Sequence, residues 1–390
     1  MMADRSTIRD VAKAAGVSVK TVSRVLNDHP YVKSPTRAKV QAVMAQLAFR
    51  PSLAARSLAG ARSGQIALIY DNHSPYYIHA IQEGCWTRCS ENGVRLLAQP
   101  VNVADDSAAE AVRGLIGETH VDGVILSSPV TDCVAVLDVL EAAAIPFVRI
   151  SPGTNHAMAS SVFMDDAQAG DDITTHLINL GHRRIAHIMG HPNHMASDAR
   201  LFGYRRALDR AGIPFDPQLV LPGSFDFDSG VAAAQQLLLL NPCPTAIFAA
   251  NDDMAAGVLS VAHARGIPVP DALSVAGFDN TTLARMVWPP LTTIEQPTRA
   301  MAYAAATLLL EQIQGEAQSV IVHRLHQRLP HQLLVRASTA PPPASPAPLC
   351  LLWILCTLPA VAPHSARRGK FHCLTPLEEQ STGPNTFTMP

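Results

Sequence analysis

The most constraining feature of this chain is a regular alternation, from residue 64 onward, of short apolar runs with longer segments of helical periodicity. Seven runs have the length and composition of buried strands, at 65–70, 95–100, 121–128, 145–150, 184–190, 245–251 and 273–279. The intervening segments predict helices at 77–93, 109–120, 133–145, 170–182, 203–213, 230–241 and 254–267. This alternation predicts an α/β fold with parallel sheets covered on both faces. Since one sheet of ordinary size cannot hold so many units, we expect two sheets with a cleft between them.

Polar residues stand at the carboxyl ends of four predicted strands. They are Asp71 and Asn72, Ser127 and Ser128, 251–253, and Asp279 with Asn280. Taken singly, each is more typical of a helix N-cap or a turn than of a ligand contact. In open α/β sheets, however, ligands bind beyond the carboxyl ends of the strands. Four such ends facing one cleft therefore favour a small-molecule site.

The charge of the chain is divided unevenly between its first 62 residues and the rest. The net charge is only −2, yet residues 1–62 hold eleven Lys and Arg against three Asp and Glu, a balance of +8. The remaining residues have a balance of −10. A basic head on an acidic body indicates a polyanionic partner for the head. The alternative is a basic face that meets only solvent.

The first 50 residues predict three short helices. Thr7 is a suitable N-cap for the segment IRDVAKAA, and Gly16 can end that helix in the left-handed conformation. Ser18 caps a second segment, VKTVSRVLN, and Ser34-Pro35 opens a third, TRAKVQAVMAQL. Two helices joined by a short glycine-containing turn predict a helix-turn-helix. Its small core is expected to contain Val11, Val22, Val25, Val40 and Leu47.

The second helix is the predicted recognition helix. Val19 and Lys20 stand at its N-terminus, where such a helix reaches base edges: lysine can donate to guanine, and valine can contact a thymine methyl. The polar face of this helix also carries Ser23, Arg24 and Asn27. Residues suited to phosphate contacts are Thr7, Ser18, Asn27, Tyr31 and Thr36. Taken alone, the pair of helices could equally be an ordinary hairpin with a solvated polar face.

The segment DVAKAAGVSVKTVSRVLN closely resembles, without gaps, the DNA-binding signature of the lactose-repressor/galactose-repressor (LacI/GalR) family. The resemblance continues through FRPSLAARSLAGARS, which is similar to the hinge segment of the family. It implies that 51–62 forms a hinge helix on DNA, where Leu58, with Ala55 beside it, wedges into the minor groove. A helix this short is marginal in water, so it would order only against DNA and a second copy. The alternative is a plain linker with Leu58 packed on the core.

The body resembles the same family and, through it, the periplasmic sugar-binding proteins. The blocks LGHRRIAHIMG, ARLFGYRRAL, AIFAANDDMAAGVL, SVAGFDN and PPLTTIEQP match in order and spacing, so the resemblance covers residue 6 to about 339. It implies a periplasmic-binding-protein-like core of two doubly wound parallel-sheet subdomains that binds a small-molecule effector, a sugar. By position, the implied effector contacts are Asp71, Asn72, Tyr76, Arg200, Phe225, Asn251, Asp279 and Gln296. The position aligned with an acidic effector contact in sugar-responsive members is Gln168, so the particular sugar stays open.

Together these features predict a cytoplasmic, homodimeric transcription regulator that binds a pseudo-palindromic operator in double-stranded DNA. A repressor is favoured, and activator action stays open. The expected domains are 1–50 for the helix-turn-helix, 51–62 for the hinge, 63–339 for effector binding and dimerisation, and 340–390 for a Pro-rich, disordered tail. Inducer and corepressor action both stay open, because both use the same cleft. The main alternative, a sugar-binding transport protein, would need a signal peptide and would not carry a helix-turn-helix.

No cofactor, metal or catalytic residue is expected. Cys85 and Cys89 lie one helical turn apart, but no His or Cys partners follow at zinc spacing, so we interpret them as reduced thiols. The sequence contains no P-loop and no G-x-S-x-G or H-E-x-x-H motif. An enzyme is therefore disfavoured, and no apolar run is long enough to predict a membrane span.

Overall fold

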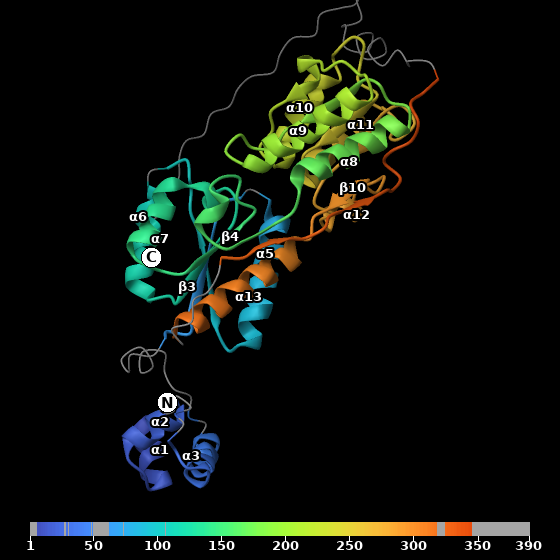
Figure 1. The fold of residues 1–390 in the computed structure, drawn as a ribbon. Helices are drawn as coiled ribbons and strands as arrows, with labels where there is room; N and C mark the ends of the chain where they lie inside the picture. Colours follow the sequence, from blue (N-terminus) through green and yellow to red (C-terminus); the bar gives the residue numbers. More distant parts are fainter. Residues whose placement is uncertain are drawn as a thin grey trace, which may run out of the picture. The chain divides into compact units, whose positions relative to one another are not determined.

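The computed structural model describes residues 6–26, 29, 31–47, 49, 62–72, 74–105, 107–317 and 324–344 (Figure 1). These residues form a three-helix head and two α/β subdomains, which we call the first and the second subdomain in the order in which the chain enters them. Three residues expected to contact DNA, Asn27, Ala55 and Leu58, lie outside the described residues, and so does the tail beyond residue 344.

The head consists of α1 (Ile8–Ala15), α2 (Val19–Leu26) and α3 (Ser34–Gln46). Thr7 caps α1 through a capping box, because its hydroxyl accepts from the Asp10 N–H while the Asp10 carboxylate accepts from the Thr7 N–H. Gly16 ends α1 at φ 63°, the left-handed conformation that turns the chain toward α2. The predicted helix-turn-helix is confirmed. Its predicted core residues pack together, with the first four buried: Val11, Val22, Val25, Val40 and Leu47.

The first subdomain is built on a six-stranded parallel sheet with the order β11-β5-β4-β3-β1-β2. Its strands are β1 (Gln65–Tyr70), β2 (Arg95–Pro100), β3 (Gly123–Leu126), β4 (Phe147–Ile150), β5 (Ser161–Phe163) and β11 (His326–Arg328). Its helices are α5 (Pro75–Glu91), α6 (Ser107–Thr119), α7 (Val134–Ala142) and α13 (Thr298–Ala317), with 3₁₀ turns η1 (Val130–Asp132) and η2 (His156–Met158). Alternate residues of β1 enter different cores: Ile66 and Leu68 pack with α5 and α13, whereas Ala67 and Ile69 pack with α6 and α7. Helices therefore cover both faces of this sheet.

The second subdomain is built on a four-stranded parallel sheet with the order β7-β6-β8-β9. Its strands are β6 (Ile185–Ile188), β7 (Val220–Leu221), β8 (Ala246–Ala249) and β9 (Ser274–Ala276). Its helices are α8 (Asp166–Asn179), α9 (Met195–Arg210), α10 (Phe227–Leu237), α11 (Asp252–Ala264) and α12 (Leu283–Met286), with the 3₁₀ turn η3 (Pro217–Leu219). Ile185 and Phe248 pack with α8 and α9, whereas Ala186 and Ile247 pack with α10 and α11. This sheet too is covered on both faces.

Three short crossovers join the two subdomains. The chain passes from β5 to α8, returns from β10 (Thr293–Glu295) through Pro297 to α13, and passes again from β11 to β12 (Gln332–Leu334). β10 and β12 pair antiparallel. The N–H of Ala340 still donates to the Ser274 hydroxyl at 3.0 Å, one residue beyond the expected end of the body. Crossovers of this kind form a hinge about which two subdomains can open and close.

The two-sheet architecture confirms the prediction from the alternating pattern. Every strand and helix predicted for the body is found, with ends shifted by up to four residues, except that α9 begins eight residues earlier than the predicted 203–213. The sequence did not predict α13, a 20-residue helix. It also did not predict the short strands β5, β7, β10, β11 and β12 or the short helix α12. Strands of two or three residues are too short for a two-residue period to be recognised.

Candidate functional site

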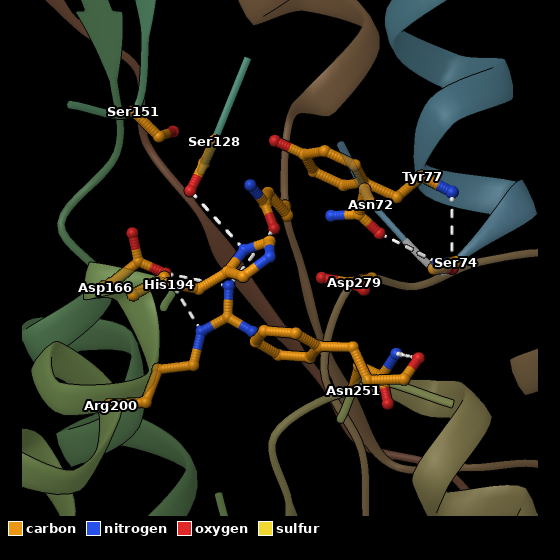
Figure 2. Close-up of a pocket in the computed structure, with 13 residues that line it drawn as sticks. Asn72, Ser74, Tyr77, Ser128, Ser151, Asp166, His194, Arg200, Asn251 and Asp279 are labelled. Atoms are coloured by element: carbon orange, nitrogen blue, oxygen red, sulfur yellow. Dashed lines mark hydrogen bonds and ion pairs between the residues drawn. The ribbon is translucent and has the colours of Figure 1, made fainter. Parts of the chain in front are cut away.

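A cavity lies between the two subdomains, near the carboxyl ends of their strands (Figure 2). We call it the central cavity. Its volume is about 30 Å³, which leaves room for little more than ordered water. The cleft is therefore closed in this structure. The central cavity is lined by Asn72, Ser74, Tyr77, Ser128, Ser151, Asp166, His194, Ala196, Arg200, Phe225, Asn251, Asp279 and Gln296.

Arg200 of α9 supplies the cationic group of the central cavity and is only 4% exposed. Its Nε donates to Asp166 Oδ1 at 2.9 Å, and its Nη2 forms an ion pair with the same carboxylate at 2.8 Å. Its other donors reach the Ala250 carbonyl and the Gln296 amide oxygen. The guanidinium carbon lies 3.6 Å from the centre of the Phe278 ring. The charge is thus held in a fixed orientation by planar stacking and directed hydrogen bonds.

Asn251 fixes the aromatic wall of the central cavity. Its Oδ1 accepts from the Met254 N–H at 2.9 Å and caps α11, while its Nδ2 donates to the Phe225 carbonyl at 2.8 Å. Phe225 has a φ of 60°, a conformation that residues other than glycine rarely adopt, and this bond helps to hold it there. The Phe225 ring meets the His194 ring edge-on, with centroids 5.1 Å apart. The result is an apolar face inside a polar cavity.

Asp279 directs a carboxylate at the central cavity from the turn after β9. Its N–H donates to the Ile294 carbonyl at 2.8 Å, which ties this turn to β10. Burial raises the pKa of its carboxyl well above the ordinary value; Arg200 opposes this effect, and Asp252 and Asp253 reinforce it. Among the described residues, none donates a hydrogen bond to the Asp279 carboxylate. A ligand hydroxyl would supply the donor that this acceptor lacks.

Hydrogen bonds between described residues cross the cleft between the subdomains. The Ser74 hydroxyl, just before α5, donates to Asp253 Oδ2 of α11 at 2.8 Å. Ser128, after β3, lies 3.5 Å from Nδ1 of His194, just before α9. The Ser74 N–H in turn donates to Asn72 Oδ1 at 2.8 Å, which fixes the turn that presents the hydroxyl. Figure 2 shows the contact between Ser128 and His194 and the bond between Ser74 and Asn72.

The structure brings six of the eight expected effector contacts together in the central cavity: Asn72, Arg200, Phe225, Asn251, Asp279 and Gln296. It does not bring Asp71 and Tyr76 there. Asp71 accepts a hydrogen bond from the Val103 N–H at 2.9 Å, and Tyr76 is 37% exposed on α5. Tyr77 lines the cavity instead, because one step along a helix turns the side chain by about 100°.

An acidic residue does line the central cavity: it is Asp166, two residues before Gln168. The Gln168 side chain bonds Asp172 and Arg206 and does not line the cavity. Five other lining residues carried no sequence signal strong enough to place them there. They are Ser74, Tyr77, Ser151, His194 and Ala196. Ser128 was among the residues noted at strand ends.

The head presents most of the expected DNA contacts to solvent. Lys20 and Arg24 are exposed along α2, and Val19 at its start is 42% exposed. Tyr31 is 87% exposed, whereas Ser23 and Thr36 are half-buried. Two further expected contacts are exposed but also cap helices: Thr7 and Ser18.

Two negative findings apply to the described part of the chain. It contains no group of three or more His, Cys, Asp or Glu side chains placed to hold a metal ion. None of its helices is both long enough and apolar enough to cross a membrane.

Two family descriptions match the chain. "Bacterial regulatory proteins, lacI family" matches residues 7–52, and "Periplasmic binding protein-like domain" matches residues 174–339. The first match covers the helix-turn-helix. The second covers most of the second subdomain, the second and third crossovers, and α13 and β11 of the first subdomain. Fold and site therefore define a class of protein, the transcription regulators that join a DNA-binding head to a periplasmic-binding-protein-like core.

Named regulators are similar to this chain over nearly its whole described length. The HTH-type transcriptional regulator DegA of Bacillus subtilis is 36% identical over 341 residues, covering 86% of this chain and 99% of DegA. The HTH-type transcriptional repressor PurR of Vibrio atlanticus is 32% identical over 333 residues, covering 85% and 99%. The chain belongs to the lacI family of bacterial regulatory proteins and is a DNA-binding transcription regulator.

Solved structures agree with this assignment. The Lac repressor dimer bound to operator and the anti-inducer ONPF superposes with a TM-score of 0.74 at 29% identity, covering 86% of this chain and all of that one. The complex of the transcriptional regulator CelR with cellobiose superposes with a TM-score of 0.66 at 34% identity and the same coverage. These likenesses extend over the head and both subdomains.

Proposed function

We propose that this chain is a repressor whose affinity for its operator is controlled by a sugar bound in the central cavity. One observation carries the proposal: the Arg200 guanidinium, the Asn251 amide and the Asp279 carboxylate line a single cavity beside the Phe225 ring. Donors and acceptors around an apolar face suit the paired hydroxyls and the flat side of a sugar ring. A solved CelR complex with cellobiose and an Enterococcus faecium family member with bound ribose support a sugar as the effector class.

The closed cleft gives a route from the sugar to the DNA. A cavity of about 30 Å³ is too small for a sugar, so binding requires the cleft to open or its walls to rearrange. A ligand that prefers one cleft geometry shifts the population toward it. The crossovers transmit this rotation to the first subdomain, whose first strand follows the hinge segment 51–62 in the sequence. We propose that the protein binds and releases its ligand without converting it chemically. We also propose that it acts in the cytoplasm, where operator DNA lies.

On the DNA side, we propose a homodimer on a pseudo-palindromic operator, with one head in each major-groove half-site. The Lac repressor dimer bound to operator supports this arrangement. Leu58 of each copy is proposed to wedge between base pairs in the minor groove and bend the duplex. Leu58→Ala should then weaken operator binding and reduce the bend in gel-shift bending assays, with sugar binding unchanged. A variant that binds and bends its operator like wild type would leave Leu58 as a linker residue.

The proposal is tested with the full chain in two steps. Selection from genomic fragments identifies the operator, and fluorescence anisotropy then measures operator affinity with glucose, galactose, ribose, cellobiose or maltose present. At least one sugar should change the dissociation constant of the operator by about tenfold, the range of ordinary coupling energies. Binding of a purine in place of every sugar would refute the sugar assignment and leave the regulator assignment intact.

A further inference from the structure

A second cavity adjoins the central cavity and is much larger. It has a volume of about 440 Å³, against about 30 Å³ for the central cavity, and we call it the side cavity. The two cavities share three lining residues, Ser151, Asp166 and Ala196. The side cavity is formed by the loop after β4, the first turn of α8 and the first turn of α9. A ligand in the central cavity could therefore extend past the shared wall into the side cavity.

The side cavity combines an apolar wall with acidic side chains. Phe163, Met164 and Met195 line it, and Met195 is a large apolar side chain that remains 39% exposed. The carboxylates of Asp165, Asp166 and Asp198 also line it. An apolar face next to hydrogen-bond acceptors is suited to a second sugar ring.

The charges around the side cavity select against an anionic ligand. Its lining includes no Lys or Arg side chain. Two of its carboxylates already pair with cations, since Arg200 pairs with Asp166 at 2.8 Å and Arg328 with Asp165 at 3.4 Å. A phosphate on the second unit would meet carboxylates with no cation of the lining to balance it. An uncharged unit with hydroxyl donors suffers no such penalty.

The wall of the side cavity is held in place by a buried ion pair. Arg149 of β4 is fully buried and pairs with the Asp132 carboxylate at 2.8 Å. The same carboxylate accepts from the N–H groups of Gly153 and Thr154, both in the loop after β4. A side chain at Gly153 would collide with Met195, because an added Cβ would lie 2.2 Å from the Met195 side chain. The loop and α9 thus approach closely in a fixed geometry, which lowers the cost of binding a ligand there.

We propose that the side cavity is a second subsite of the effector site, and that the effector is an uncharged disaccharide or glycoside. One unit lies against Arg200 and Asp279 in the central cavity, and the second lies against Phe163 and Met195 in the side cavity. This inference rests on the proposed sugar control of the regulator and specifies the size and charge of the sugar. The volume of the side cavity falls within the range of small-molecule sites.

Calorimetry on the full chain tests the second subsite with cellobiose, maltose, glucose and glucose 6-phosphate as probes. At least one disaccharide should bind about tenfold or more tightly than glucose, and glucose 6-phosphate should bind more weakly than glucose. Met195→Trp fills the side cavity and should weaken disaccharide binding by about tenfold while leaving glucose binding within about twofold. Leu239→Trp is the matched control, because Leu239 is 63% exposed and lines neither cavity. Asp198→Asn removes an acceptor without adding bulk and should weaken only the disaccharide.

The outcomes separate this inference from the proposed function. If glucose binds as tightly as either disaccharide, or if Met195→Trp weakens both classes of sugar equally, the second subsite is refuted while sugar control survives. If no sugar binds and none changes operator affinity, the proposed function fails and the inference fails with it. Thermal unfolding of each variant verifies that lost affinity does not come from an unfolded protein.

Discussion

Replacing Ser74 with alanine tests whether the closed cleft is held by a bond between the subdomains. The Ser74 hydroxyl donates to Asp253 Oδ2 at 2.8 Å across the cleft, and Asp253 is only 8% exposed. Burial raises the pKa of Asp253, and the bond from Ser74 acts in the opposite direction by stabilising the carboxylate. Ser74→Ala leaves this carboxylate with fewer donors in the closed state, whereas water can solvate it in an open cleft. The variant should therefore favour the open cleft.

The size of the effect follows from the bonds that remain. A hydrogen bond to a charged group contributes about 1.5–3 kcal/mol. Asn251 Nδ2 still reaches the Asp253 carboxylate at 3.2 Å in the variant, so we expect the lower end of that range. About 1.5 kcal/mol shifts the ratio of closed to open molecules by roughly tenfold. Ser74 also caps α5 through a long bond of 3.5 Å to the Tyr77 N–H, but that bond can form in either state.

Small-angle X-ray scattering measures the opening of the cleft directly. Ser74→Ala should increase the radius of gyration of the ligand-free protein, and Ser74→Thr, which retains a hydroxyl, should not. Because the closed cavity is too small for a sugar, the dissociation constant of the sugar should fall in Ser74→Ala by up to the same factor of roughly ten. Identical scattering and identical sugar affinity in wild type and Ser74→Ala would show that this bond does not hold the cleft closed.

Three further predictions concern other parts of the molecule. Asp279→Asn should weaken sugar binding by about 1–3 kcal/mol in calorimetry, because the carboxylate is expected to accept a hydrogen bond from the ligand. Thermal stability should change little, because asparagine also suits the φ of 104° at this position. Unchanged sugar affinity would remove Asp279 from the site. Lys20→Ala should relax base preference at one position of each half-site by about 1–3 kcal/mol, whereas equal loss on operator and random DNA in competition assays would assign Lys20 to phosphate contacts. Hydrogen bonding to Arg210 and Arg206 lowers the pKa of Asp171 from 3.8 to about 2. The ionised Asp171 side chain therefore adds about 2 kcal/mol to the free energy of unfolding above the unfolded pKa, and this contribution is lost as pH falls through about 2. The destabilisation caused by Asp171→Asn should then be about half as large at pH 3 as at pH 7 in denaturant titrations, and a pH-independent effect would contradict this assignment.

Local patterns in the sequence were sufficient for most of the fold. The capping residues of the head and the apolar runs of the body depend on neighbours within one or two turns, and both are where the sequence predicted them. The helix α13 was not predicted, because its place depends on a distant segment. Its residues Met301, Ala302 and Ala305 pack in one core with Ile78 and Ile81 of α5. No local period indicates that these two helices share a core.

The candidate site divides in the same way. Asn251 and Asp279 follow strands, so the topology of a parallel sheet alone brings them toward the cleft. Tyr77 was not identified, because choosing it over Tyr76 requires the rotation of α5 to within one residue. Ser74 and His194 lie in loops, and their cross-cleft bonds exist only because the two subdomains close on each other. Contacts that form only when the cleft closes leave no local pattern in the sequence of either subdomain.

We propose that occupancy of the cavity between the subdomains changes the affinity of the head for operator DNA. The most direct measurement is an operator binding isotherm by fluorescence anisotropy, recorded with and without saturating sugar for wild type and for Asp279→Asn. Our account predicts that the sugar shifts the wild-type dissociation constant by about tenfold, and that Asp279→Asn binds operator normally without sugar but requires a higher sugar concentration for the same shift. A sugar that binds the wild-type protein and leaves the operator isotherm unchanged would contradict the account.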